Sequence, residues 1–461
     1  MKIVVCVKPS ITGEIGAFEA AAYEAALRVE GAEVILLSMA PEKSKELLLR
    51  LTRLGAKEAV LLSDRAFAGA DTLATGYALS LALERLKPDL VLCGRQTMEG
   101  DTAQVGIGLA TYMGYSLATR VMSIDANEGE VKVTTRAGEE KTLPYPAVLT
   151  LERIHELRLP SIRSKPTSVS VLTASDLGAD ISRCGLQGSP TKVMKTFENQ
   201  SGKRRAKEIA AESFDEVIKN CLSTPAKNAV TAKPCETPLK NLWVFGAPAE
   251  AMARTVSDDV KVFSLDYTAD EIVDKIREGN PSAVLWDSSD KGKELASTVA
   301  VKLQTGLCAD CTLLETDGED LFMYRPAFSG NVIAKIRCVT KPIMATVRTK
   351  AESAELIFGI GAGAVQYKDE ICRLAEKYGA EIAASRAVVD SGAMKYETQV
   401  GLTGKTVAPR VYVAFGISGA VHHIAGIQGA GDIIAVNCDK SAEIFDYADY
   451  KIVADIKDLL K

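Results

Sequence analysis

Residues 381–423 read EIAASRAVVDSGAMKYETQVGLTGKTVAPRVYVAFGISGAVHH, and this stretch organises the chain. Its apolar runs 381–384 and 411–414, together with a later run at 433–436, have the length and composition of buried strands. Small and polar residues follow each run, which is typical of parallel strands whose carboxyl ends face a nucleotide. The pattern predicts a doubly wound parallel sheet with a binding site at one edge.

The turns after these runs supply the candidate binding groups. Gly416 and Gly419 allow the backbone to approach a phosphate closely, and the helix that follows directs N–H groups at an anion. Arg386 and His423 are the cationic or cation-capable side chains at these turns. Taken singly, a glycine-rich turn of this kind also serves packing alone, and that alternative stays open for each motif.

Length and composition describe a multidomain globular protein. The 461 residues suggest about three domains, with 47 % apolar and 25 % charged residues. The net charge of −5 argues against nucleic-acid binding. No run reaches the roughly 18 apolar residues of a spanning helix. The opening MKIVVCVKPS enters a strand directly, so we expect a cytoplasmic protein without membrane insertion.

The ten cysteines include one close pair, Cys308 and Cys311. Such a CxxC is either a redox dithiol, half of a metal site, or a pair of small buried thiols. No second pair or nearby histidine completes a zinc site, and no iron–sulfur spacing is present. We therefore predict no metal site.

The first third alternates between strand and helix patterns. Strands are expected at 3–7, 34–38, 59–62 and 90–93, and helices at 17–29, 43–54 and 74–86. This order predicts a parallel sheet with helices on both faces. Residues 119–160 change to alternating polarity with turn signals and predict antiparallel hairpins.

Two loops in this part carry polar groups at strand ends, residues 62–72 and 93–106. In each loop an Asp-Thr pair precedes or opens a helix, which provides a cap and a set of free N–H groups. The pairs are Asp71-Thr72 and Asp101-Thr102. An ordinary helix cap without a ligand is the alternative.

The middle of the chain changes composition at residues 199–238. An amphipathic helix is expected at about 204–221, with the basic residues 203–205 at its solvated start, followed by a proline-rich tether. The strand–helix pattern restarts at 242, and residues 323–348 predict hairpin strands. A last domain starts near Glu355, where a glycine-rich loop follows a strand.

Together these motifs resemble the electron transfer flavoprotein family. The segments VGLTGKTVAPRVYVAFGISGAVHHIAG, IIAVNCD and DYADY resemble the FAD-binding domain of its alpha subunit. The segments LSDRAFAGADTLATGYAL, VLCGRQTMEGDTAQVG and LPYPAVLTLE resemble its beta subunit. The resemblance implies that a gene fusion joins both subunits in one chain.

The resemblance also implies the fold and the domains. We expect an α/β protein with Rossmann-like sheets of the adenine nucleotide alpha hydrolase type, added antiparallel hairpins, and a C-terminal doubly wound FAD-binding domain. The expected domains are a beta-like nucleotide-binding domain at 1–200, a helix and linker at 201–240, an alpha-like domain at 241–352, and the FAD-binding domain at 353–461.

By the same resemblance, one FAD binds in the C-terminal domain. A protonated His423 would stabilise an anionic flavin semiquinone, Arg386 would lie over the ring, and Thr403 would offer its hydroxyl to N5. The residues implied to bind the cofactor are Gly361, Ser385, Arg386, Val400, Gly401, Thr403, Gly404, Gly416, Ile417, Ser418, Gly419, Ala420, His422, His423, Asn437 and Asp449, with the last two at the adenosine end. Leu402 and His422 replace family glutamines.

A second nucleotide is implied in the N-terminal domain, either FAD or AMP. Its expected contacts are Gly94, Asp101, Thr102, Ala103, Gln104, Asp71 and Thr72. The DRAFAGADT loop favours a second FAD, whereas the abbreviated partner-docking loop at 159–168 favours AMP.

Three functions follow. The first is an electron carrier that accepts electrons from a flavin-containing dehydrogenase, such as an acyl-CoA dehydrogenase of fatty acid oxidation, and passes them to an acceptor protein. The second is a two-FAD electron-bifurcating flavoprotein that oxidises NADH with a partner. The third is a non-redox adenine-nucleotide-binding protein.

Overall fold

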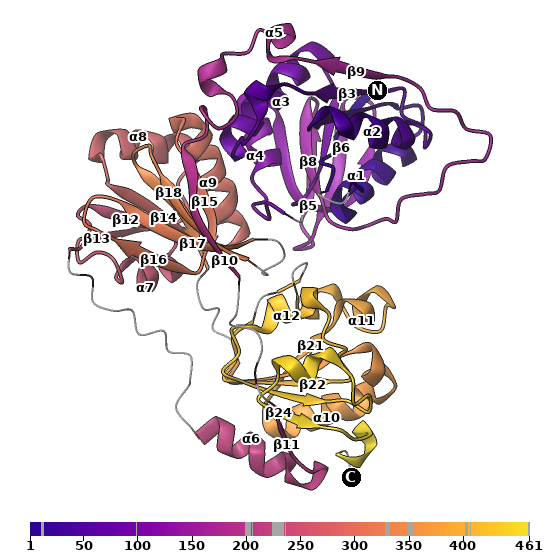
Figure 1. The fold of residues 1–461 in the computed structure, drawn as a ribbon, viewed down its shortest axis with the longest axis vertical. Helices are drawn as coiled ribbons and strands as arrows, with labels where there is room; N and C mark the ends of the chain where they lie inside the picture. The colour runs from indigo at the N-terminus through magenta and orange to yellow at the C-terminus, as the bar shows by residue number, and fades with distance from the viewer. Residues whose placement is uncertain are drawn as a thin grey trace. The chain divides into compact units, whose positions relative to one another are not determined.

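The computed structural model describes residues 1–10, 13–97, 99–198, 204, 206–223, 235, 237–327, 332–348, 354–401, 404–405 and 407–459. The chain divides into two compact units (Figure 1). The first unit comprises residues 1–196, 234–328 and 334–349, and the second comprises 197–233, 329–333 and 350–461. Among the described helices, none has the length and apolar character needed to cross a membrane.

The first half of the first unit is a nine-stranded sheet in the order β7-β6-β5-β8-β4-β1-β2-β3-β9. Its strands are β1 (Lys2–Cys6), β2 (Glu33–Met39), β3 (Glu58–Leu62), β4 (Leu90–Gly94), β5 (Ser116–Ala126), β6 (Glu130–Thr135), β7 (Glu140–Pro144), β8 (Ala147–Leu151) and β9 (Val169–Leu172). Its helices are α1 (Ala17–Arg28), α2 (Lys45–Thr52), α3 (Thr72–Leu86), α4 (Val105–Met113) and α5 (Ala174–Leu177). Buried apolar residues form one core on each face. The predicted parallel sheet is confirmed.

The hairpins predicted for residues 119–160 are confirmed in part. β5, β6 and β7 pair in antiparallel fashion. β8, however, runs parallel between β4 and β5, in the middle of the sheet. All five of its residues are buried, because helices cover both faces there, and such a strand loses the alternation that marks a hairpin.

The second half of the first unit repeats this plan. A five-stranded parallel sheet has the order β13-β12-β14-β19-β15, and a four-stranded sheet has the order β10-β18-β17-β16. The strands are β10 (Thr191–Glu198), β12 (Leu242–Phe245), β13 (Val260–Phe263), β14 (Ala283–Asp287), β15 (Leu307–Cys311), β16 (Leu313–Thr316), β17 (Leu321–Ala327), β18 (Val332–Cys338) and β19 (Ile343–Val347). The helices are α7 (Glu250–Ala253), α8 (Ala269–Gly279) and α9 (Asp290–Leu303). β19 lies between β14 and β15, as β8 lies between β4 and β5.

The second unit is a six-stranded parallel sheet in the order β11-β24-β23-β22-β20-β21. Its strands are β11 (Lys207–Glu208), β20 (Leu356–Ile360), β21 (Glu381–Ala384), β22 (Val411–Phe415), β23 (Asp432–Val436) and β24 (Tyr450–Ile452). Its helices are α6 (Phe214–Ser223), α10 (Lys368–Tyr378), α11 (Arg386–Asp390) and α12 (Val421–Ile427). Together with the first unit, this confirms the predicted α/β class with parallel sheets and added antiparallel strands.

The segment before α6 differs from its prediction. The helix begins at Phe214 rather than near 204, and β11 extends the sheet of the second unit beside β24. Arg204 ion-pairs with Asp449 and donates to the carbonyl oxygens of Ala430 and Gly431, so it is not a solvated helix start. These contacts and the buried face of α6 attach residues 204–223 to the second unit.

Candidate functional site

The carboxyl edge of the second unit's sheet contains a reversal of strand order. The chain passes from β20 to β21 on one side, whereas β22, β23 and β24 follow on the other side of β20. Ligands in open α/β sheets bind in the crevice at such a point. Gly361 follows β20 and Gly416 follows β22, so the two glycine loops meet at this crevice.

The two loops pack directly on each other. The Gly363 N–H donates to the Gly416 carbonyl at 3.1 Å, and a Cβ on Gly361 would lie 2.2 Å from that same oxygen. Gly416 has a φ of +59°, and a Cβ there would lie 2.6 Å from the Ala364 nitrogen. These glycines therefore serve close packing between the two loops. This role does not depend on which ligand binds at the edge of the sheet.

The turn from Gly416 into α12 presents a row of unused donors. Among the described residues, the backbone N–H groups of 418–422 have no acceptor. These residues include the predicted Ser418, Gly419, Ala420 and His422. Adjacent N–H groups at a turn into a helix attract an anion such as a pyrophosphate. The geometry therefore suits the phosphates of a dinucleotide.

Asn437 fixes the shape of this turn. Its Nδ2 donates to the Ile417 carbonyl at 3.0 Å, and its Oδ1 accepts from the Asp439 N–H at 3.0 Å. Both ends of the buried amide are thus used inside the protein. Asn437 lies at the predicted site, but its side chain positions the Gly416 turn.

His423 lies beneath the same turn and is 6 % exposed. Its Nε2 is 3.1 Å from the Tyr412 hydroxyl, and its Nδ1 has no hydrogen-bond partner among the described residues. Burial lowers the pKa of His423 to about 4, an effect that the backbone of Val400 offsets only in part. The ring is neutral near pH 7, in contrast to the protonated ring that the resemblance implied.

Ser385 and Arg386 begin α11 at the carboxyl end of β21. The Ser385 N–H donates to the Ile360 carbonyl at 2.8 Å, which holds this turn against the end of β20. The Arg386 side chain is 40 % exposed and pairs with Asp390 at 3.0 Å. Its guanidinium thus lies at the carboxyl edge of the second unit's sheet and is accessible to a ligand.

The loop after η7 (Tyr396–Thr398) supports α12. The Val400 N–H donates to Ala384, and a Cβ on Gly401 would lie 2.9 Å from the His422 carbonyl oxygen. Gly404 is equally tight, because a Cβ there would lie 2.2 Å from the Gln399 carbonyl oxygen. The predicted Leu402 and Thr403 lie outside the described residues.

Asp449 is separated from these residues. Its Oδ2 accepts from the Ile433 N–H at 2.9 Å and pairs with Arg204. Ile433 is the second residue of β23 and Asp449 directly precedes β24, so this carboxylate lies at the amino edge of the sheet. The role of Asp449 at the adenosine end stays a prediction, and in this structure its carboxylate is engaged within the protein, away from the glycine turns.

In the first unit, the side chains of Asp71 and Thr72 are committed to the protein. Asp71 Oδ1 caps α3 through the N–H groups of Leu73 and Ala74, and its Oδ2 accepts from the Thr191 N–H and hydroxyl. The Thr72 hydroxyl donates to Gln104 Oε1 at 2.8 Å. The cap alternative describes Asp71, and the hydrogen bonds of both side chains are made within the protein.

The loop 101–104 retains donors for an anion. Asp101 and Ala103 have φ values of +51° and +56°, and the N–H groups of 102–104 have no acceptor among the described residues. Successive residues of alternating backbone handedness aim their amides at one point and form an anion-binding nest. Burial raises the pKa of the Asp101 carboxyl, whose Oδ1 contacts Gln96 Nε2 at 2.5 Å.

The glycines of this site serve close packing. A Cβ on Gly94 would lie 2.8 Å from the backbone of Phe18 and Glu19, and a Cβ on Gly106 would lie 2.5 Å from Thr150 Cγ2. Gly94 therefore lets α1 begin against the end of β4. The equivalent position in the second half is Asp287, whose carboxylate fills the space beside Gly246 and repels an anion. This edge of the second half is therefore less suited to an anion than the matching edge of the first half.

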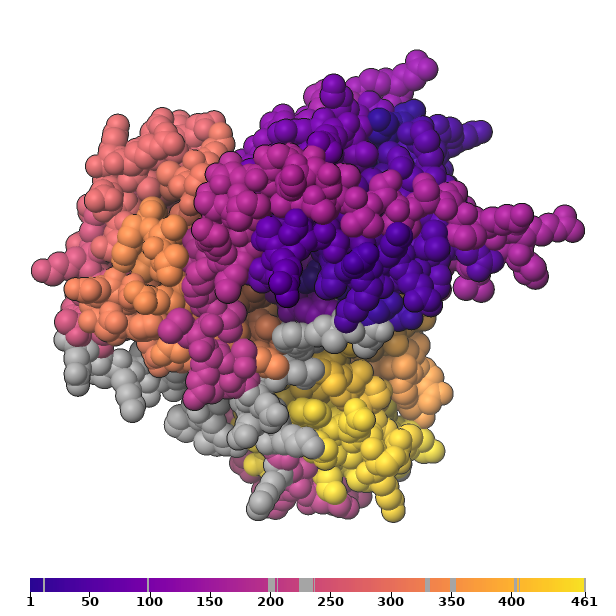
Figure 2. All heavy atoms as spheres, turned by 45° about the horizontal axis from the view of Figure 1, so that its top comes forward, coloured from indigo at the N-terminus to yellow at the C-terminus, as the bar shows by residue number. Residues whose placement is uncertain are grey.

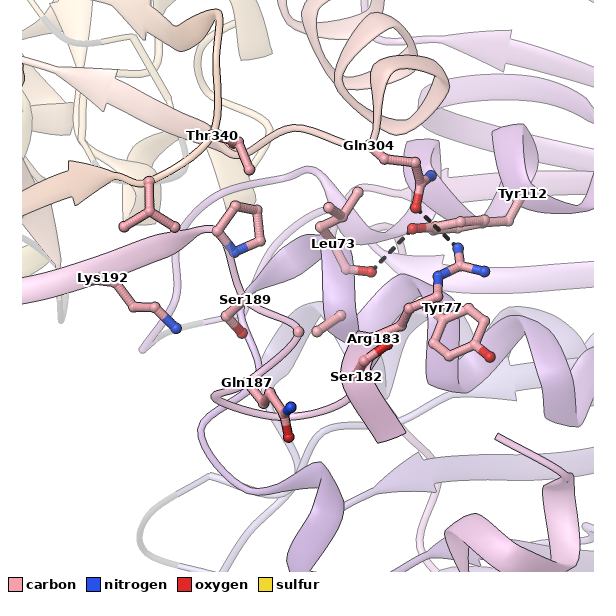
Figure 3. A pocket seen from close by; sticks show the side chains of 14 residues that line it. Leu73, Tyr77, Tyr112, Ser182, Arg183, Gln187, Ser189, Lys192, Gln304 and Thr340 are labelled. Carbon is pink, nitrogen blue, oxygen red and sulfur yellow. Dashed lines mark hydrogen bonds between the residues drawn. The ribbon is translucent and has the colours of Figure 1, made fainter. Parts of the chain in front are cut away.

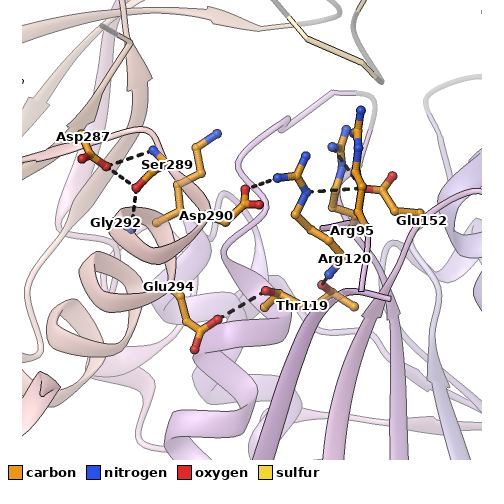
Figure 4. A network of polar contacts seen from close by, with 12 residues as sticks. Arg95, Thr119, Arg120, Glu152, Asp287, Ser289, Asp290, Gly292 and Glu294 are labelled. Carbon is orange, nitrogen blue, oxygen red and sulfur yellow. Dashed lines mark hydrogen bonds and ion pairs between the residues drawn. The ribbon is translucent and has the colours of Figure 1, made fainter. Parts of the chain in front are cut away.

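Sequence reasoning missed two groups near this loop. Glu19 is 4 % exposed in the first turn of α1, and burial raises its pKa to about 7. Glu152 is 1 % exposed and lies 3.3–3.7 Å from the guanidinium groups of Arg95, Arg120 and Arg136 (Figure 4). Arg120 also pairs with Asp290 of α9, which links the two halves of the unit. The polar Arg95 at a strand end was visible in the sequence, but the burial of Glu19 and Glu152 was not.

Comparison with known proteins agrees with this arrangement. The electron transfer flavoprotein domain model matches residues 3–177 and 252–384, and the electron transfer flavoprotein FAD-binding domain model matches residues 350–428. The chain therefore belongs to the electron transfer flavoprotein family.

Relatives of both subunit types match. Electron transfer flavoprotein subunit beta of Thermoanaerobacterium thermosaccharolyticum is 39 % identical over 43 % of this chain and 80 % of its own length. Subunit alpha of the same organism is 36 % identical over 42 % of this chain and 73 % of its own length. Protein FixB of Clostridium saccharobutylicum is 34 % identical over 48 % of this chain and 80 % of its own length. The predicted combination of beta-like and alpha-like parts in one chain is confirmed.

Proposed function

We propose that this chain is a single-chain electron transfer flavoprotein, which accepts electrons from a partner dehydrogenase and passes them to an acceptor protein. The observation that carries the proposal is the row of unused N–H groups at 418–422, beside the reversal of strand order, in a segment that matches the family's FAD-binding domain. Bound FAD supplies the redox chemistry, and the protein supplies binding, orientation and electrostatics.

The residues of this edge fit the cofactor. The amides of 418–422 bind the pyrophosphate, and Asn437 keeps their turn in shape. Arg386 contributes a permanent positive charge at an accessible position. The neutral ring of His423 lies buried beneath the same turn.

A second adenine nucleotide at the 101–104 loop is the finer part of the proposal. The unused amides there suit one phosphate or a pyrophosphate equally, so they support FAD and AMP alike. Asp71 and Thr72, which favoured a second FAD in the sequence, are engaged within the protein. The similar LctC of Acetobacterium woodii is a subunit of lactate dehydrogenase (NAD(+),ferredoxin), which keeps electron bifurcation with NADH as the second candidate.

The partner is proposed from an exposed apolar segment. Leu159 and Ile162, between β8 and β9, are 90 % and 99 % exposed, and the segment projects from its unit (Figures 1 and 2). Exposed apolar side chains of this kind mark interaction sites. The similar acryloyl-CoA reductase electron transfer subunit beta of Anaerotignum propionicum supports an acyl-CoA-linked partner.

Cofactor extraction tests the proposal. The purified protein is denatured, and the released nucleotides are separated and quantified against chain concentration. One FAD with one AMP per chain supports the simple carrier, and two FAD per chain favour bifurcation, which NADH reduction then tests. A colourless protein that neither contains nor takes up flavin would overturn the redox function.

A further inference from the structure

The first unit contains a cavity that neither candidate nucleotide loop uses (Figure 3). Its volume is about 540 Å³, within the range of small-molecule sites. Residues 182–192 and the start of α3 form one wall, and the end of α9 with the β18–β19 turn forms the other. The cavity therefore lies between the two halves of this unit.

The floor of the cavity is apolar and aromatic. Tyr77, Tyr112 and Leu73 of the first half line the cavity together with Val339 of the second half. The Tyr77 hydroxyl accepts from the Asp180 N–H, and the Tyr112 hydroxyl contacts the Leu73 carbonyl at 3.4 Å. Because their hydroxyls are held at these partners, both rings have fixed positions and offer a rigid surface to a ligand.

Arg183 is held at the centre of the cavity. Its guanidinium stacks 3.9 Å above the Tyr77 ring, and its Nη2 donates to Gln304 Oε1 at 2.9 Å. This pair of contacts fixes the plane of the guanidinium and leaves further N–H groups for a ligand. A fixed planar fork of donors matches a carboxylate or phosphate.

The charge of the cavity is positive and unbalanced. Arg183 and Lys192 are its ionisable cations, its lining contains no carboxylate, and no ion pair of either is found among the described residues, although Lys192 Nζ donates to the Leu186 carbonyl. The nearby Asp180 carboxylate accepts from the Ser182 N–H and hydroxyl instead. An anion entering the cavity therefore meets two cations and no competing acid.

We propose that this cavity binds a small organic anion. Its carboxylate or phosphate is held by Arg183, its apolar or aromatic body lies on Tyr112 and Leu73, and Lys192 adds positive charge from the opposite side of the cavity. The site is adjacent to the first loop of the candidate nucleotide site, because the Ser189 hydroxyl of its wall accepts from the Asp71 N–H at 2.7 Å. The proposal does not depend on which nucleotide occupies that loop.

Isothermal titration of the full-length, cofactor-loaded protein tests the site with three probes of equal aromatic body: benzoate, phenyl phosphate and the neutral benzyl alcohol. We expect saturable binding of one or both anions with a Kd of roughly millimolar or tighter, and much weaker binding of the alcohol. The anion that binds more tightly identifies the preferred head group.

Variants locate the binding. Arg183→Gln keeps hydrogen-bonding capacity without charge and should weaken anion binding about tenfold or more, equivalent to about 1.4 kcal/mol. Lys192→Gln should weaken it less, and Lys141→Gln, on β7, should leave it unchanged. Circular dichroism verifies folding. Failure of both anions to bind, equal binding of benzyl alcohol, or a Kd unaffected by both Arg183→Gln and Lys192→Gln would overturn the proposal.

Discussion

Arg120 and Asp310 occupy the same position in the two halves of the first unit, and both have a φ of +55°. Each lies in a bulge where its strand shifts register against the neighbouring parallel strand, β5 against β8 and β15 against β19. Each bulge N–H donates to a threonine hydroxyl, Thr150 at 3.1 Å and Thr346 at 2.8 Å.

The charges at these positions are reversed. Arg120 faces Glu152, which follows β8, whereas Asp310 faces Arg348, which follows β19. Positive φ is costly for both residue types, and such conformations persist where surrounding contacts over-determine them. The bulges therefore aim two oppositely charged side chains at the matching strand ends of the two halves.

Thr150→Val and Thr346→Val should each destabilise the first unit. Valine has nearly the same shape but leaves the bulge N–H without its acceptor, which costs about 1–3 kcal/mol for a buried donor. Thr150 and Thr346 are 2 % and 1 % exposed, so water does not replace the hydroxyl. Urea unfolding measures the change, and Thr142→Val, at an exposed strand position, is the control. Equal midpoints for all three variants would contradict this account.

Asp449→Asn should destabilise the second unit by about 2–4 kcal/mol, because it leaves the partly buried Arg204 without its carboxylate. FAD affinity under native conditions should stay nearly unchanged, since Asp449 lies at the amino edge of the sheet. Urea unfolding and flavin titration measure the two quantities. Glu443→Gln, an exposed acid in the same unit, serves as control. A large loss of FAD affinity without loss of stability would return Asp449 to the binding site.

The sequence predicts a strand well where a run of residues is apolar and short. It does not predict how a strand pairs where that depends on strands far away in the sequence. The runs that form β1, β4 and β22 are apolar, and buried residues pack on both faces of their sheets. β8 was assigned to a hairpin because nothing in its own residues shows that it inserts beside β4. β11 is two residues long, and its pairing with β24 depends on contacts about 240 positions away in the sequence.

The candidate site shows the same limit. The sequence marks Gly416 as a position of close approach and, through the resemblance, Gly361 and Gly401 as cofactor contacts, but it does not show that backbone of the same unit fills the space beside them. The sequence shows Asp71 and Asn437 as polar residues at turns. It does not show that every polar group of their side chains has a protein partner. The sequence predicts where these residues lie along the chain and near which turns. It does not predict which groups their side chains bond to.

Leu159→Ser combined with Ile162→Ser should leave the stability of the chain unchanged, because both side chains are almost fully exposed. The rate at which a partner dehydrogenase reduces the bound flavin should fall about tenfold or more if these side chains anchor the partner. Stopped-flow reduction with an acyl-CoA dehydrogenase measures the effect. The double change Val193→Ser and Met194→Ser, at another exposed apolar pair, is the control. Equal rates for both double variants would remove the docking role.

Glu19→Gln should stabilise the first unit at high pH. The folded pKa of about 7 exceeds the ordinary value of 4.5, so the folded state binds the proton more tightly than the unfolded state. The contribution of Glu19 is therefore fully present below pH 4.5 and is lost as pH rises through 7. By pH 8 the loss is about 3 kcal/mol, which glutamine should restore. Urea unfolding from pH 4.5 to 8 measures the slope, and Glu46→Gln on α2 should not change it.

His423→Gln should change the pH dependence of the second unit in the opposite sense. Burial lowers the folded pKa of His423 to about 4 from 6.5, so the unfolded state binds the proton more tightly. The stability due to the neutral ring is present above pH 6.5 and is lost as pH falls through 4, by about 3 kcal/mol in total. Glutamine does not titrate, so the variant should lose less stability between pH 7 and 4 than the parent protein.

The same variant tests the charge of His423 beside the cofactor. A ring that is neutral from pH 6 to 8 acts on bound FAD only as a hydrogen-bonding group, which glutamine can partly replace. We expect unchanged FAD stoichiometry and a modest shift of the flavin potential. We also expect the potential to depend on pH in the same way in the parent protein and in the variant. Spectroelectrochemical titration of both proteins at several pH values measures this, and NMR of the His423 ring gives its pKa directly. A ring that titrates near pH 7 in the loaded protein, with a matching step in the potential, would contradict the neutral ring and restore the cationic role.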